Sequence, residues 1–102
     1  MREKALKEFI EKLKAQFPGR IEKIVLFGSY VRRDYDEESD IDVLIVGELS
    51  LDDILDLIFE IMLKYGVLIN AITESKEEFE RLKETSFHKI ILSEGAVLYE
   101  KT

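Results

Sequence analysis

Two segments with the composition of β-strands, Ile21 to Phe27 and Asp40 to Val46, flank a polar stretch that begins with Gly28 and Ser29. The first segment becomes fully apolar toward its end, and the second is short and rich in β-branched residues. Because side chains two apart lie on the same face of a strand, the carboxylates of Asp40 and Asp42 are expected to share one face. The other face of that strand is left free to pack in a core.

The order of these segments constrains how they pair. The Gly28-Ser29 corner ends the first strand, and Asp40 begins the second. If the strands were parallel, seven residues rising ~3.3 Å each would separate the corner from the aspartates by roughly 23 Å. The two strands must therefore run antiparallel if the corner and the aspartates are to share one ligand.

The rest of the chain alternates between helical and strand patterns. Apolar residues recur at helical spacing from Leu6 to Phe17, ahead of Pro18 and Gly19. The expected elements that follow are a capped helix Leu51 to Tyr65, a strand Val67 to Ile72, a helix after the Ser75/Glu78 capping pair, a helix around Phe87 to Leu92 and a strand Ala96 to Tyr99. Residues 1–102 are thus expected to form a single α/β (α+β) domain, with a small mixed sheet covered by helices.

Composition excludes several classes of protein. The 22 acidic and 15 basic residues give a net charge of -7, which disfavours binding of long nucleic acid. The chain has no cysteine and one histidine, so disulfide scaffolds, thiolate nucleophiles and thiolate zinc sites are excluded. No apolar run approaches the ~20 residues of a membrane span, and the charged N-terminus does not look like a signal peptide. A cytoplasmic protein without a membrane partner is expected.

The paired aspartates and the Gly-Ser corner complement each other chemically. Two carboxylates on one face repel each other unless a cation lies between them, and oxygen ligands without His or Cys favour Mg²⁺. Gly28 lets the backbone approach a ligand closely, while Ser29 can cap a following helix whose amides hold a phosphate. These residues together predict a site for a metal-bound nucleoside triphosphate.

The chain contains a Gly-Ser pair, ten further residues, then Asp-x-Asp and an apolar strand. This pattern resembles the signature of the polymerase-beta-type nucleotidyltransferases. The length of the chain is similar to that of the minimal nucleotidyltransferases (MNT), which are antitoxins of HEPN/MNT toxin–antitoxin pairs. The resemblance spans roughly Ile21 to Tyr99 in element order, and its specific part is Gly28 to Val46.

The resemblance implies a role for each matching residue. It assigns Gly28, Ser29 and Arg32 to nucleotide binding, and Asp40 and Asp42 to catalysis and to a two-metal Mg²⁺ site. Phosphoryl transfer depends on positioning and charge neutralisation more than on covalent catalysis. Two metals ~4 Å apart supply both. The implied reaction is transfer of AMP from Mg-ATP to an acceptor. The implied acceptor is a tyrosine of a HEPN toxin partner; a homo-oligomer is the other assembly that the sequence allows.

Two positions depart from the family pattern. Arg33 stands where MNT sequences have glycine, and Asn70 is the only polar candidate on the third strand, where the family has a third carboxylate. An amide cannot act as a general base and brings no charge to a second metal. Asn70 is therefore an uncertain third-ligand position, and Glu74, just past the expected strand, is the nearby carboxylate.

A second hypothesis follows from Asn70. The chain could be a catalytically weakened MNT-fold binding module that neutralises or regulates its partner by contact. A ribonuclease hypothesis rests on Arg81 and His88, whose spacing matches the Arg-x4-6-His motif of HEPN ribonucleases. That fold is an all-helical bundle, so His88 is expected to be a surface or packing residue. Phe79, Phe87 and the apolar residues near them are expected to be core, with any excess serving a partner surface.

Overall fold

The computed structural model describes residues 2–28 and 40–101. Their order is α1 (Arg2–Gln16), β1 (Ile21–Phe27), β2 (Ile41–Gly47), α3 (Leu51–Tyr65), β3 (Ile69–Glu74), α4 (Lys76–Leu82), α5 (Ser86–Glu94) and β4 (Ala96–Glu100). The expected mixed α/β class is confirmed. The segment from Ser29 to Ser39, with the short helix expected in it, lies outside the described residues.

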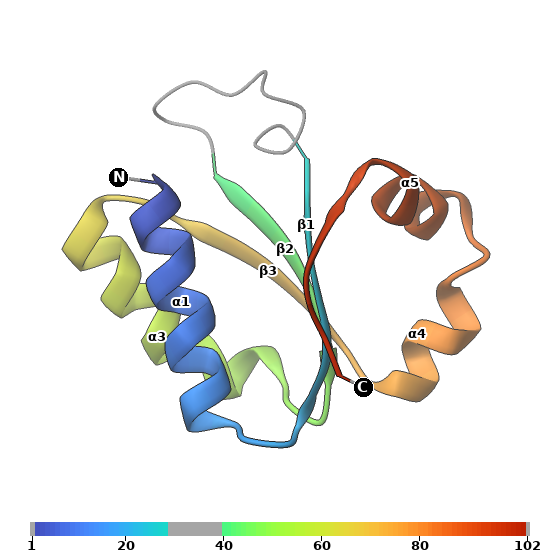
Figure 1. The fold of residues 1–102 in the computed structure, drawn as a ribbon, viewed down its shortest axis with the longest axis horizontal. Helices are drawn as coiled ribbons and strands as arrows, with labels where there is room; N and C mark the ends of the chain where they lie inside the picture. The colour runs from blue at the N-terminus through green and yellow to red at the C-terminus, as the bar shows by residue number, and fades with distance from the viewer. Residues whose placement is uncertain (1, 29–39, 102) are drawn as a thin grey trace.

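The four strands form one sheet in the order β3-β2-β1-β4. β1 pairs antiparallel with β2 and with β4, whereas β2 and β3 are parallel. The predicted antiparallel first pair is therefore confirmed. As a consequence, the C-terminal end of β1 and the N-terminal ends of β2 and β3 meet at one edge of the sheet (Figure 1).

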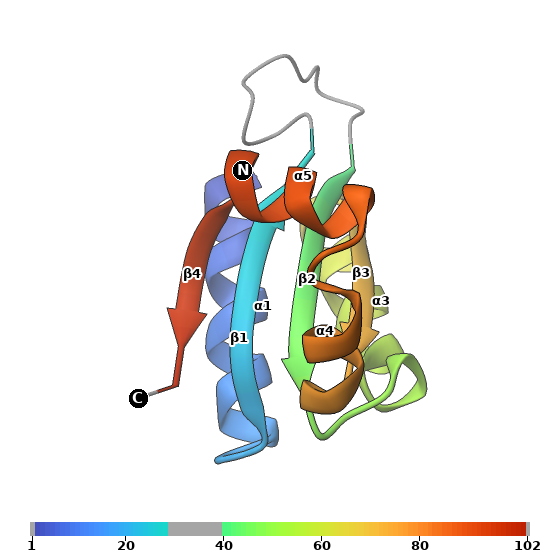
Figure 2. The same ribbon diagram turned by 90° about the vertical axis from the view of Figure 1, so that its right-hand side faces the viewer.

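Helices cover both faces of the sheet. α1 and α3 lie on one face, and α4 and α5 lie on the other, as Figures 1 and 2 show from two directions. The larger core lies under α1 and α3, where Phe9, Ile41 and Val43 are fully buried. A smaller cluster under α4 and α5 contains Leu44 and Ile91. The sheet is thus packed on both sides, with more apolar material on the α1/α3 side.

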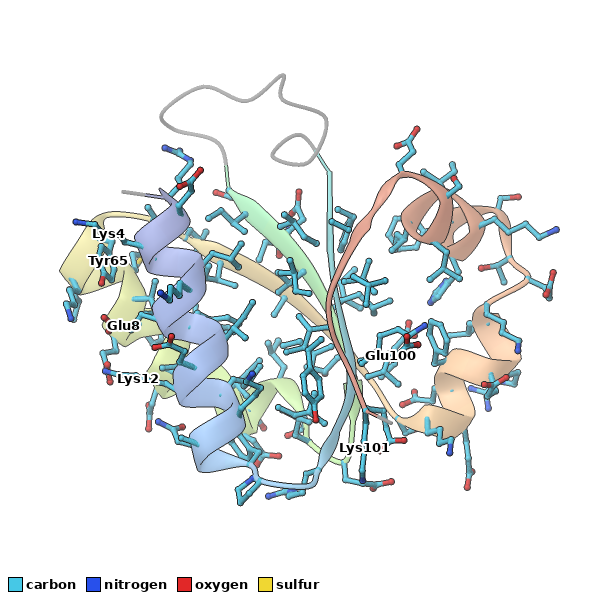
Figure 3. All side chains as sticks on the ribbon, viewed as in Figure 1. Lys4, Glu8, Lys12, Tyr65, Glu100 and Lys101 are labelled. Carbon is cyan, nitrogen blue, oxygen red and sulfur yellow. The ribbon has the colours of Figure 1, made fainter. Side chains whose placement is uncertain are left out.

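Helix α1 is tied to α3 by a polar cluster on their outer side (Figure 3). Glu8 accepts hydrogen bonds from Lys64 at 2.8 Å and from the Tyr65 hydroxyl at 2.7 Å. Lys12 lies 3.3 Å from the Glu8 carboxylate and also pairs with Glu60. The hydrogen bonds from Lys64 and Tyr65 lower the pKa of Glu8 from 4.5 to about 2.

The residues expected to begin and end helices do so in the structure. Ser75 and Glu78 form a reciprocal capping box at the start of α4, with bonds of 3.1 and 2.8 Å. Gly66 ends α3 with a positive φ of 67° and donates its N–H to the carbonyl of Met62. None of the helices described is long and apolar enough to cross a membrane.

The third strand differs from the predicted range, Val67 to Ile72. Its ladder with β2 begins at Ile69, opposite Ile41, and continues to Glu74, opposite Val46. The parallel register decides both ends, because β3 can extend only as far as β2 offers it hydrogen bonds. Glu74 therefore belongs to the strand instead of following it.

Candidate active site

Asp42 lies at the centre of the edge where three strands meet. It is half-buried in β2, opposite Phe27 of β1 on one side and Asn70 of β3 on the other. Asp40 is exposed and immediately precedes the strand. Ile41 and Val43 are fully buried in the larger core, so β2 turns Asp42 to the opposite, α4/α5 face.

Gly28 lies directly against the carboxylate of Asp42. Its φ is +81°, a left-handed conformation that side chains other than glycine rarely adopt. A Cβ atom at this position would lie 2.2 Å from Asp42 Oδ2, far inside van der Waals contact. Only glycine can therefore occupy this corner while Asp42 keeps its position. The antiparallel pairing brings the corner and this carboxylate together, as the geometric argument required.

Gly28, Asp42 and Asn70 form a row across the ends of β1, β2 and β3. The side-chain nitrogen Nδ2 of Asn70 donates a 2.9 Å hydrogen bond to Asp42 Oδ1. The amide thus holds one oxygen of Asp42, while the other oxygen faces Gly28. The amide oxygen of Asn70 keeps its lone pairs and can ligate a hard cation, although it adds no charge.

Glu74 is remote from this row. It stands four residues beyond Asn70 on the same strand, which at ~3.3 Å per residue places it roughly 13 Å away. Its carboxylate oxygen Oε2 lies 2.7 Å from Nε2 of His88, and both side chains are buried. The structure therefore excludes Glu74 as the third carboxylate beside Asp42.

The buried Glu74–His88 pair was not anticipated from the sequence. The other ring nitrogen of His88, Nδ1, lies 3.1 Å from the Thr85 hydroxyl, which donates to the Leu82 carbonyl. The pair joins α5 to the end of β3. No local pattern reveals a contact between residues 14 apart on different elements.

The position of His88 also bears on the ribonuclease motif. His88 belongs to α5 and is 5% exposed, whereas Arg81 is exposed on α4. The structure is a sheet covered by helices instead of an all-helical bundle. The expectation of a packing residue is correct for His88, and the alternative expectation of a surface residue is wrong.

Three residues named from the sequence, Ser29, Arg32 and Arg33, lie outside the described residues, so their assignments stay predictions. Within residues 2–28 and 40–101, no group of three or more His, Cys, Asp or Glu side chains could hold a metal ion. The predicted oxygen donors that the structure describes at this edge are the two aspartates and the Asn70 amide. A donor set of this size suits Mg²⁺, which binds through one or two carboxylates and takes its other ligands from water and substrate phosphates.

A groove of about 350 Å³ lies elsewhere, between α1 and Leu98 of β4. Leu6 and Ile10 contribute to its lining, but none of the predicted site residues does. Its position thus sets it apart from the row of Gly28, Asp42 and Asn70.

Comparison with known proteins agrees with this geometry. The family model described as "Nucleotidyltransferase domain" matches residues 6–99. The chain is 58% identical over 97 residues to "Putative protein adenylyltransferase MJ0604" of Methanocaldococcus jannaschii, covering 95% of this chain and 97% of that protein. It is 40% identical over 76 residues to "Putative protein adenylyltransferase MJ0141" of the same organism, covering 70% of this chain and 77% of that protein.

Solved structures share the fold. A chain of a toxin–antitoxin complex with AMP-PNP aligns with a TM-score of 0.63 and 21% identity, covering 93% of this chain and 73% of that one. A chain of a complex between tri-AMPylated Shewanella oneidensis HEPN toxin and MNT antitoxin aligns with a TM-score of 0.60 and 18% identity, covering 99% and 74%. The family match over residues 6–99 and the 58% identical relative confirm the resemblance carried by Gly28 to Val46: the chain belongs to the nucleotidyltransferase domain family.

Proposed function

We propose that this nucleotidyltransferase binds Mg-ATP at the Gly28–Asp42 corner and transfers AMP to a tyrosine of a HEPN toxin partner, acting as its antitoxin. The observation that carries the proposal is the contact between the corner and the carboxylate, which leaves no room for a side chain at Gly28. The names of the curated relatives and the AMPylated toxin in a complex of the same fold support AMP as the transferred group.

Each site residue has a proposed role. Asp40 and Asp42 hold Mg²⁺, and Asn70 orients Asp42 through its amide hydrogen bond. Gly28 and Ser29 hold the triphosphate, with Arg32 beside them. When bound, the metal neutralises charge on the phosphates. In the reaction a bond forms between the acceptor oxygen and the α-phosphorus, the α–β phosphate bond breaks, and pyrophosphate leaves with the bonding pair.

The acceptor hydroxyl must also lose its proton. The amide of Asn70 cannot take it, because an amide is not a base at neutral pH. Asp40 and Asp42 are assigned to Mg²⁺, so the proton passes to solvent or to a group of the acceptor protein. A tyrosine hydroxyl needs less help from a base than an aliphatic hydroxyl, since its pKa is about 10.

A second candidate function is favoured by Asn70. With an amide where the family has a third carboxylate, a second metal would be held less strongly. The chain would then act on its partner by contact, with a weakened nucleotide pocket. The two functions predict different covalent states of the partner.

The experiment that tests the proposal uses the HEPN protein that co-purifies with the tagged chain. The complex is incubated with Mg-ATP, and the partner is analysed by intact-mass and peptide mass spectrometry. Addition of AMP to a partner tyrosine, absent with the Asp40→Asn chain, supports the proposal. A partner that is bound but stays unmodified supports the contact hypothesis.

A further inference from the structure

Helix α5 carries an exposed aromatic ring close to the candidate site. Phe87 lies in the first turn of α5 and is 51% exposed, although its apolar character predicted a core position. Its ring packs edge-to-face on Phe27, with ring centroids 6.2 Å apart and planes at 89°. Figure 2 shows α5 beside the end of β1, at the edge where β1 and β2 meet the site.

Phe27 connects this ring to the site. It is the residue immediately before Gly28, and its partner across the β1–β2 ladder is Asp42. Residues directly opposite each other on antiparallel strands place their side chains on the same face of the sheet. Phe27 and Asp42 therefore both face α5, and the Phe27–Phe87 pair forms an aromatic wall next to the carboxylate.

The wall is held firmly in place. On its other side Phe87 contacts the His88 ring, at 5.7 Å between centroids. His88 is fixed to β3 through Glu74, and Ile91 of the same helix is 2% exposed in the smaller core. The helix that presents Phe87 is thus anchored at two buried points, while about half of the Phe87 side chain stays exposed to solvent.

We propose that Phe87, supported by Phe27, is the platform on which the base of the bound nucleotide stacks. This inference rests on the proposed function, because it takes the phosphates to lie at Gly28 and Asp42. The base of a nucleoside triphosphate is separated from its β- and γ-phosphates by the ribose and the α-phosphate, so it must lie beside the phosphate corner. The aromatic wall offers an exposed ring next to that corner, with Phe87 packed on the residue that precedes Gly28.

The chemistry of the platform also sets its selectivity. Aromatic rings stack on the π-face that every base possesses, so stacking contributes affinity with little discrimination between bases. ATP and GTP are therefore expected to gain equally from Phe87. Tripolyphosphate, which has the phosphates but no base, gains nothing from it.

The absence of tryptophan from the chain allows a direct test. Phe87→Trp introduces a single indole at the proposed platform, and Ile90→Trp introduces one at a 55% exposed position on the same helix as a matched control. Each variant is titrated with Mg-ATP and with Mg-tripolyphosphate. We expect Mg-ATP to quench the Phe87→Trp fluorescence, tripolyphosphate to leave it unchanged, and Ile90→Trp to respond to neither.

Affinity provides the second readout. Phe87→Ala should weaken Mg-ATP binding about tenfold in isothermal titration while leaving tripolyphosphate binding unchanged, and Ile90→Ala should change neither. If Phe87→Ala does not fold, the Phe87→Trp titration decides the question. Mg-ATP binding that is indifferent to Phe87 overturns this inference alone. A wild-type chain that binds no Mg-ATP overturns the proposed function together with it.

Discussion

Asn70 donates a 2.9 Å hydrogen bond from Nδ2 to Asp42 Oδ1 across the parallel strands β2 and β3. The side chain therefore lies on the same face as Asp42, at the position that we assign to the third ligand. In this chain the position holds a neutral amide, which orients Asp42, instead of a negatively charged carboxylate. Under the proposed function, we expect the strength of metal binding and the rate of transfer to depend on the residue at this position.

Replacing Asn70 with Asp should strengthen metal binding. The new carboxylate would lie beside Asp42, so without metal the two charges repel and lower the thermal midpoint. With Mg²⁺ present, the thermal midpoint of Asn70→Asp should instead exceed that of the wild type. AMP transfer should also rise, because a second metal and a base become available. Thermal unfolding across a Mg²⁺ titration measures both effects.

The matched control at this position is Asn70→Ala. It removes the hydrogen bond to Asp42 without adding charge, so it should cost about 1 kcal/mol of stability without Mg²⁺ and gain no more stability from added Mg²⁺ than the wild type does. An Asn70→Asp variant that shows the same Mg²⁺ response as Asn70→Ala would contradict the assignment of this position to the metal site.

Adding a single methyl group at Gly28 should abolish nucleotide binding. In Gly28→Ala the new Cβ would overlap Asp42 Oδ2, and φ of +81° adds about 1–2 kcal/mol of backbone strain. Gly19→Ala is the control, since Gly19 has a similar φ of +74° but no atom within 4 Å of the added Cβ. Both variants should lose stability in urea unfolding, and only Gly28→Ala should lose Mg-ATP binding. Equal nucleotide affinity in the two would show that the corner is not the phosphate site.

The buried Glu74–His88 pair should matter for stability and not for transfer. Glu74→Ala leaves His88 buried without its partner and should cost about 3 kcal/mol in urea unfolding. Glu84→Ala removes an exposed carboxylate near the same helix and should stay within about 0.5 kcal/mol of wild type. Under conditions where both are folded and Mg-ATP saturates the site, the rate of AMP transfer should be unchanged. A selective loss of transfer at saturating Mg-ATP in Glu74→Ala would place that carboxylate in the reaction.

The Glu8 cluster predicts an acid-dependent loss of stability. Hydrogen bonds from Lys64 and Tyr65 lower the pKa of Glu8 to about 2 in the folded chain, from 4.5. A lowered pKa stabilises the fold fully above the unfolded value, and the contribution disappears as the pH falls from about 4.5 to about 2. Glu8→Gln should therefore be less stable than wild type at pH 7, with the difference shrinking through that window.

Urea midpoints measured between pH 7 and pH 2.5 test this dependence. Glu11→Gln, an exposed position on the same helix, serves as the control and should differ little from wild type at any pH. A Glu8→Gln difference that stays constant down to pH 2.5 would show that the ionisation of Glu8 does not contribute to stability.

Much of the fold was predictable because local signals and burial agreed. β1 and α3 have the predicted bounds, and the predicted pairing of the first two strands is found. The bounds of β3 were not predictable, because its ladder depends on β2, more than 20 residues earlier in the chain. Gly28 and Asp42 could be placed together by topology, whereas the Glu74–His88 pair depends on how α5 packs on the sheet.

Burial on α5 also depends on tertiary packing that the local sequence pattern does not reveal. Phe87 and Ile91 are both apolar and four residues apart, yet one is 51% exposed and the other 2%. Helical periodicity predicts that both face the core. The packing of α5 at the end of the sheet leaves Phe87 open, which the pattern of apolar residues could not predict.

Transfer of label from doubly labelled ATP tests the central claim most directly. The complex with the co-purified HEPN protein is incubated with Mg²⁺ and ATP carrying one isotope at the α-phosphate and another at the γ-phosphate. We predict that the partner acquires the α-label without the γ-label, that pyrophosphate is released in equal amount, and that Asp42→Asn abolishes both. A partner that acquires the γ-label, or no label while the wild-type chain still neutralises it, would contradict adenylylation by this site.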